Sequence, residues 1–82
     1  MPRFFFHLAI DNRATPDTEG IELLDLAHAK VEAEANCRGF AVEELRFGRA
    51  FPLTSKVEVC DERGKVVHVA WTKDLIPEAA ST

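Results

Sequence analysis

One long helix-forming segment limits how this chain can fold. Residues 26–47 are rich in alanine, leucine, glutamate and lysine, which favour helices. Asp25 stands before this segment as a predicted N-cap, and Gly48 follows it as a predicted stop. A helix of this kind has to bury an apolar stripe against another layer of secondary structure. The rest of the chain must therefore supply that layer.

Segments on both sides of the helix have the pattern of strands. Residues 3–10 alternate with a period of two, and residues 13–15 form a predicted short edge strand that ends at Pro16. Two further strands are predicted at 57–60 and 65–72. The sequence therefore predicts an α+β domain. A small antiparallel sheet of three or four strands, in β-β-α-β-β order, would be covered on one face by one long helix.

The last two strands form a predicted hairpin. Asp61 opens its turn and Gly64 closes it. The expected register sets Cys60 opposite Val66 and Glu58 opposite His68. The face toward the helix would then hold Phe4, Phe6, Leu8, Val57, Val59, Val67, Val69 and Trp71. The face away from the helix would hold Phe5, His7, Ala9, Glu58, Cys60, Val66, His68 and Ala70.

Length and composition indicate one small globular domain. The chain has 82 residues, of which 46% are hydrophobic and 29% are charged. We expect a single domain over residues 1–75 and a flexible tail over 76–82. A chain of this size buries a thin core, so a partner subunit would stabilise it.

Charge and the lack of targeting signals limit the kinds of partner that the sequence predicts. The net charge is −4, and residues 11–25 hold five acids against Arg13 alone. Such a chain does not attract phosphate backbones by its overall field, so nucleic acid is an unexpected partner. No signal peptide or membrane-spanning run is evident, which predicts a cytoplasmic protein without membrane contact. Cys37 and Cys60 lack metal or redox spacing and are expected to be reduced thiols.

Two segments carry a resemblance. The opening Met-Pro-Arg-Phe-Phe-Phe-His and the later Asp17-Thr-Glu-Gly-Ile-Glu-Leu-Leu-Asp25 resemble a family of short alphaproteobacterial proteins, described as a domain of unknown function. The likeness continues through the alanine-rich helix and the turn at 61–64, and it covers most of residues 1–72. It implies a standalone bacterial cytosolic domain. It implies no activity for any residue here.

The predicted helix is apolar over more of its circumference than one sheet can cover. The stripe expected on the sheet is Leu26, Ala29, Ala33, Cys37, Phe40 and Phe47. A second apolar group is Ala27, Val31, Ala35, Ala41, Val42 and Leu45. Loops and the C-terminal tail could cover this second group, or a second copy of the chain could.

Few residues are candidates for metal binding or catalysis. His7, Cys60 and His68 would share the outer face of the sheet, and histidine and thiolate are good zinc ligands. No fourth ligand is indicated except Glu58, and a Cys–His nucleophile pair would lack a third orienting group. Arg46 and its neighbours near the helix end more simply complement the helix dipole. We therefore expect no catalytic residue, no metal and no cofactor.

These observations favour a non-enzymatic protein-binding or regulatory module that acts as a homodimer or binds another protein. The alternatives are a nucleic-acid-binding regulator and, less favoured, a small enzyme that uses Cys60 and His68. The expected interface residues lie on the outer sheet face and on the second helix group: Phe5, His7, Val31, Ala35, Val42, Leu45, Val66, His68 and Ala70.

Overall fold

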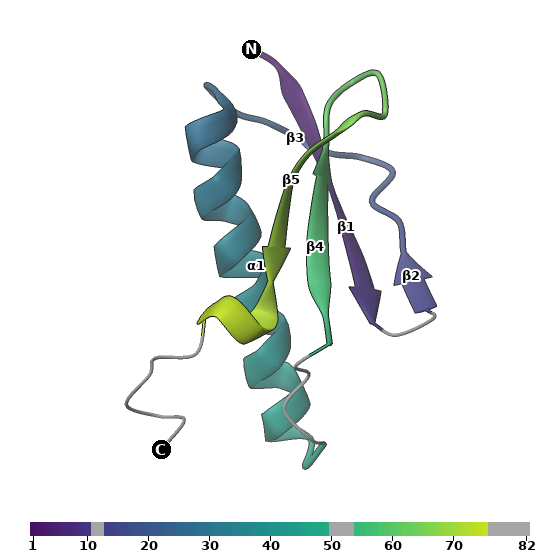
Figure 1. Cartoon of the computed structure of the whole chain (residues 1–82), viewed down its shortest axis with the longest axis vertical. Coiled ribbons are helices and arrows are strands. Elements are labelled where there is room, and N and C mark those ends of the chain that lie inside the picture. The colour runs from purple at the N-terminus through teal and green to yellow at the C-terminus, as the bar shows by residue number, and fades with distance from the viewer. Residues whose placement is uncertain (11–12, 50–53, 76–82) are drawn as a thin grey trace.

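The computed structural model describes residues 1–10, 13–49 and 54–75, so the expected tail at 76–82 lies outside the described residues. It contains one long α-helix against an antiparallel sheet, which confirms the α+β class (Figure 1). The elements are β1 (Arg3–Ile10), β2 (Arg13–Thr15), β3 (Ile21–Glu22), α1 (Leu26–Arg46), β4 (Lys56–Cys60), β5 (Val66–Trp71) and a 3-10 turn, η1 (Thr72–Leu75).

The strand order is β2-β1-β4-β5. β3 pairs with the start of β1, on the same edge on which β2 pairs with its end. Because β3 and β4 are both antiparallel to β1, they run parallel to each other, and α1 connects them. This connection is a right-handed crossover, the hand that nearly all such units adopt (Figure 1). It places α1 chiefly over β4 and β5, and therefore over one side of the sheet.

Both predicted ends of the helix are confirmed. The Asp25 carboxylate accepts a hydrogen bond from the His28 N–H at 3.0 Å, as an N-cap does. At the other end Gly48 adopts a φ of +75°. Its N–H donates to the Leu45 carbonyl at 3.0 Å, and the Arg49 N–H donates to the Glu44 carbonyl at 2.8 Å. This pair of bonds is a Schellman motif, so local residues alone terminate the helix.

Small residues bring the helix close to the sheet. The buried stripe of α1 is Ala29, Ala33, Cys37 and Ala41, each four residues after the last. It packs on larger sheet residues, among them Phe4, Phe6, Val57 and Val59. The expected stripe was therefore wrong at Leu26 and Phe47, which are exposed, and it omitted Ala41. A row of every fourth residue winds around the helix, so the contact moves from Ala29 to Ala41 as the helix crosses the sheet.

The register of the hairpin shifts by one residue in β5. Cys60 pairs with Val66 as expected, but Val59 pairs with His68 because Val67 is an extra, bulged residue. Glu58 therefore faces Val69 instead of His68. A shift of one residue reverses the side of every later side chain.

The expected faces of β5 need a corresponding correction. His68 and Ala70 lie on the helix side, and Val69 and Trp71 lie on the outer side. The expected faces of β1 and β4 agree with the structure, since Phe4, Phe6, Val57 and Val59 form the core.

Candidate interaction surfaces

The first surface is an apolar stripe on α1 that the sheet does not cover. Val31, Val42 and Leu45 are 69%, 56% and 53% exposed, and Ala35 is exposed between them. All four belong to the group that the sequence assigned to a possible interface. Polar side chains lie on both sides of this stripe: Lys30, Glu34 and Arg38 on one flank, and Glu32 and Asn36 on the other.

The hand of the crossover decides where this stripe points. In a right-handed helix Leu45 and Val42 lie about 40° and about 100° around the axis from buried Ala41. With α1 seated in a right-handed crossover, that rotation is directed toward the free side of β5. The polar residues Glu32 and Asn36 are turned toward β1 instead. Figure 1 shows α1 on the β5 side of the sheet.

The second surface is the sheet face without a helix. Phe5 and His7 of β1 lie on this face, and so do Lys56 and Glu58 of β4. All four side chains are half-buried. Trp71 forms its outer part, with the Lys56 and Lys73 ammonium groups 4.9 and 5.3 Å from its ring centre. Val66, also expected here, is 47% exposed near the hairpin turn. This face therefore mixes aromatic and charged groups.

Two residues expected on this outer face belong elsewhere. Ala70 is only 5% exposed and packs in the core beneath α1. His68 is half-buried on the same side as Ala70. The bulge at Val67 explains both errors.

The bulge also separates the residues considered for zinc binding or catalysis. His7 and Cys60 share the outer face, whereas His68 lies on the opposite face. Burial raises the pKa of the Cys60 thiol, and the carboxylates of Glu58 and Asp61 raise it further. A raised pKa opposes the thiolate that metal binding and nucleophilic attack require. Among the described residues, no three His, Cys, Asp or Glu side chains are grouped to hold a metal ion.

Both cysteines are free thiols. Burial also raises the pKa of Cys37, whose thiol donates a hydrogen bond to the Ala70 carbonyl at 3.4 Å. Nearby, the hydroxyl groups of Ser55 and Thr72 are hydrogen-bonded to each other in the core. These three polar side chains join α1 to the ends of β4 and β5, and they stabilise the fold.

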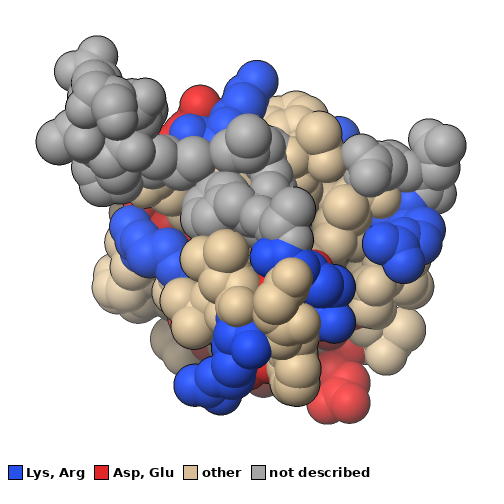
Figure 2. Space-filling view, turned by 90° about the horizontal axis from the view of Figure 1, so that it is seen from below, with Lys and Arg blue, Asp and Glu red and all other residues tan. Residues whose placement is uncertain are grey.

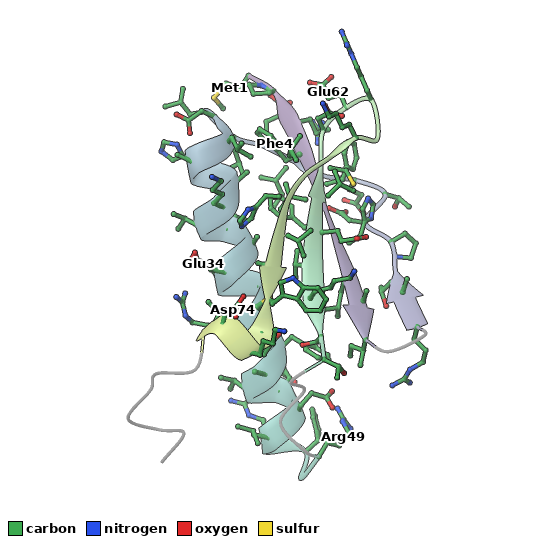
Figure 3. The ribbon with its side chains drawn as sticks, in the orientation of Figure 1. Met1, Phe4, Glu34, Arg49, Glu62 and Asp74 are labelled. Carbon is green, nitrogen blue, oxygen red and sulfur yellow. The ribbon has the colours of Figure 1, made fainter. Side chains whose placement is uncertain are left out.

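An open pocket of about 350 Å³ lies at one end of the sheet. Pro2, Arg3 and Phe4 line it from the start of β1, and the β4–β5 turn lines it from the other side. The Arg3 backbone N–H donates to a Glu62 carboxylate oxygen at 3.1 Å. Figure 3 shows Glu62 on the hairpin turn near the N-terminal end of the chain. The acid therefore holds the hairpin against β1.

The basic residues near the helix end form local ion pairs. Seen from this end, Lys and Arg side chains are prominent (Figure 2). Arg49 contacts Glu44 at 2.7 Å and Arg46 contacts Glu43 at 3.7 Å. The hydrogen bond between Arg49 and Glu44 raises the pKa of the guanidinium and lowers that of the carboxyl group. These arginines have acidic neighbours on their own chain, which reduces the attraction of this end for phosphate.

The β1 edge is closed by the segment between β2 and α1. Arg3 reaches across to this segment, where its guanidinium pairs with Glu22 at 2.8 Å and donates to the Glu19 carbonyl at 2.8 Å. Gly20 adopts a φ of +71°, and a Cβ there would lie 2.8 Å from the Phe4 carbonyl oxygen. Only glycine allows the segment to approach β1 this closely.

Asp17 completes this closure between β2 and β3. Its carboxylate accepts hydrogen bonds from the backbone N–H groups of Phe6, Glu19 and Gly20, each at 3.1 Å. Its own N–H donates to His7 Nδ1 at 2.9 Å. Desolvation raises the pKa of Asp17, but the three N–H groups outweigh it and hold the pKa below its usual value. The carboxylate thus accepts a hydrogen bond from the β1 backbone at Phe6, in the place that a carbonyl of a neighbouring strand would take.

A family model covers most of the chain, including residues of both segments that form this closure. The model describes a domain of unknown function, DUF6894, and it matches residues 3–70. This chain belongs to the DUF6894 family. No curated protein and no solved structure matches it. The expected resemblance to a family described as a domain of unknown function is therefore confirmed.

In this DUF6894 domain the two segments have structural roles in the described residues. Arg3 belongs to the first segment, and Asp17, Gly20 and Glu22 belong to the second; they hold each other along the β1 edge. Within residues 1–10, 13–49 and 54–75, no helix combines the length and the hydropathy of a membrane span. These contacts explain how the β1 edge is built.

The third surface of the DUF6894 domain, which the sequence analysis missed, is the free edge of β5. β5 is the last strand on its side of the sheet and pairs, among the described residues, with β4 alone. Its six residues, Val-Val-His-Val-Ala-Trp, include no proline, lysine, arginine or acid. The absence of such residues from an apolar run was the available signal, because natural edge strands usually carry them.

Proposed function

We propose that this DUF6894 domain is a small protein-binding module without catalytic activity, and that it acts as a homodimer. The observation that carries the proposal is the exposed stripe of Val31, Ala35, Val42 and Leu45 on α1. Large apolar side chains arranged along one side of a helix, beside a polar flank, are typical of helix surfaces that bind protein. Closed homodimers are the commonest protein assembly, so a second copy is the partner of first choice.

The positions of the other candidate residues support a binding role over an enzymatic one. Cys60 and His68 lie on opposite faces of the sheet, and burial raises the Cys60 pKa. The basic residues near the helix end are paired with acids, and the net charge of −4 opposes binding to nucleic acid.

Sedimentation velocity over micromolar to hundreds of micromolar protein tests the proposal. We expect a concentration-dependent change from 9.2 kDa to twice that mass. L45E should raise the dissociation constant by about tenfold or more, because it removes a buried leucine from the contact. N36E adds the same charge on the polar flank and serves as the matched control.

Two results would count against this function. A chain that stays at 9.2 kDa throughout the series would contradict the homodimer. Equal effects of L45E and N36E would show that the stripe on α1 is not part of the contact.

A further inference from the structure

We propose that two copies of this chain join through their β5 edges into one continuous antiparallel sheet. This inference rests on the proposed homodimer and adds the surface and geometry of the contact. The partner strand would be the same six residues, Val66–Trp71, running in the opposite direction. A two-fold axis beside β5 relates the copies, so each edge meets an identical edge.

The main-chain groups of β5 are available for this pairing. The Thr72 N–H donates to the Ser55 carbonyl at 3.1 Å, so the backbone groups of Thr72 point toward β4. Successive residues in a strand point their N–H and C=O to opposite sides. Ala70 therefore points toward β4 as well, and the N–H and C=O of Val69 and Trp71 point away from the sheet. These outward groups are the ones that a second strand would use.

The side chains of β5 suit a copy of itself. The strand has no charged residue, so two antiparallel copies bring no like charges together within Val66–Trp71. Val69 lies on the outer face with Trp71, and both are half-buried. Pairing about Val69 would set the two Val69 residues opposite each other and would extend the apolar part of this face across the axis.

The helix packs on β4 and β5 to a similar extent, so it covers the sheet beside its open edge. Continuing the sheet across a two-fold axis would place the two copies of α1 on the same face of the sheet.

The flank of α1 on the free side of β5 is mixed, since Lys30, Glu34 and Arg38 share it with Val42. Val42 and Leu45 are turned toward the free side of β5, and both are more than half exposed. These two side chains are the apolar part of the flank that a second copy would meet.

The opposite edge of the sheet offers no equivalent site. The strand β2 at that edge has three residues and begins with Arg13, and Pro16 follows it directly. Arginine and proline at an edge discourage strand addition. Pairing between copies is therefore expected at the β5 edge and not at the β2 edge.

The test compares V69P, V69K and A14K by sedimentation, with circular dichroism to check the fold. Proline at residue 69 removes an N–H that points away from β4, so the ladder with β4 keeps its bonds. We expect V69P and V69K to remain folded and to raise the dissociation constant by about a hundredfold, which corresponds to the loss of main-chain pairing. A14K places the same charge at β2 and should leave the dimer unchanged.

The outcomes separate this inference from the proposed function. If the wild type and V69K are equally dimeric, the β5 contact is wrong and the homodimer stands. If the wild type is monomeric at every concentration, both proposals fail. If V69P unfolds, V69K decides the question, because residue 69 faces Glu58 across the ladder and a lysine there has a partner in the folded chain.

Discussion

The two edges of this sheet differ in how their backbone groups are satisfied. The β1 edge is closed within the chain by β2, by β3 and by the Asp17 carboxylate between them. The β5 edge is an apolar strand that pairs with β4 alone in the described part of the chain. Buried backbone groups need partners, and exposed edges invite them. The comparison teaches that side chains of the chain itself secure the β1 edge, whereas no described residue pairs with the outer side of β5.

The difference has a visible basis in side-chain chemistry. At the β1 edge the groups that hold the segment are an arginine, an aspartate and a glycine: Arg3, Asp17 and Gly20. Each makes a contact that an apolar residue could not replace. At the β5 edge the residues are interchangeable strand formers, which suit any antiparallel partner of similar shape. Substitutions should therefore be costly to stability at the first edge and costly to assembly at the second.

Gly20→Ala should have the largest effect on the β1 edge. The added Cβ would lie 2.8 Å from the Phe4 carbonyl oxygen and 2.9 Å from Phe5 Cε2, and the φ of +71° is strained for alanine. We expect a loss of about 3 kcal/mol in the free energy of unfolding, measured by urea denaturation. Gly64→Ala is the control, since its φ is +83° but nothing lies within 4 Å of its Cβ. It should cost about 1 kcal/mol. Equal losses at the two glycines would contradict the close approach at Gly20.

Asp17→Asn should have the next largest effect. The amide retains the shape of the side chain but loses the charge that strengthens three hydrogen bonds, so we expect a loss of about 2 kcal/mol at neutral pH. Because the folded pKa of Asp17 is lowered, its contribution is present above the unfolded pKa and is lost as the pH falls through the folded value. The stability of the wild type should therefore decrease below about pH 4, and that of Asp17→Asn should decrease less.

Urea denaturation of both proteins between acidic and neutral pH measures this difference. Asp25 and Glu44 also have lowered pKa values and contribute to the decrease with the same sign in both proteins. The difference between the two curves isolates Asp17. Parallel curves would show that its carboxylate does not support the β1 edge.

Gly39→Ala should have the smallest effect, and it should alter neither edge. Gly39 lies inside α1, and a Cβ there would have nothing within 4 Å. Alanine should stabilise the helix by about 1 kcal/mol, which thermal denaturation can measure. The dissociation constant should not change. A dimer strengthened by this substitution would show that assembly follows overall stability and not the β5 edge.

Much of the fold could be predicted because its signals are local. Asp25 caps the helix by accepting a hydrogen bond from the N–H of His28, three residues further along the chain. Gly48 and Gly64 adopt positive φ values where the sequence places a helix stop and a turn. Alternation in β1 and β4 identified their faces. These features depend on neighbours along the chain and so are readable without the fold.

The rest depends on contacts between distant residues. Val66 and Val67 are both apolar, so no pattern revealed which of them forms the bulge that reverses His68 and Ala70. The exposed apolar residues of α1 could be predicted because the helix has more apolar surface than one sheet can cover. The extension of the buried stripe to Ala41 depends on how the helix crosses the sheet. The role of Asp17 requires knowing that Phe6 lies beside it.

Amide hydrogen exchange of Phe6 and Val69, followed by NMR over a range of protein concentrations, tests the difference between the two edges most directly. The Phe6 N–H donates to Asp17 within the chain, so its protection should not depend on concentration. The outward N–H of Val69 should exchange rapidly in dilute protein and slowly once dimers form. Rapid exchange of Val69 at concentrations where the protein sediments as a dimer would contradict the account.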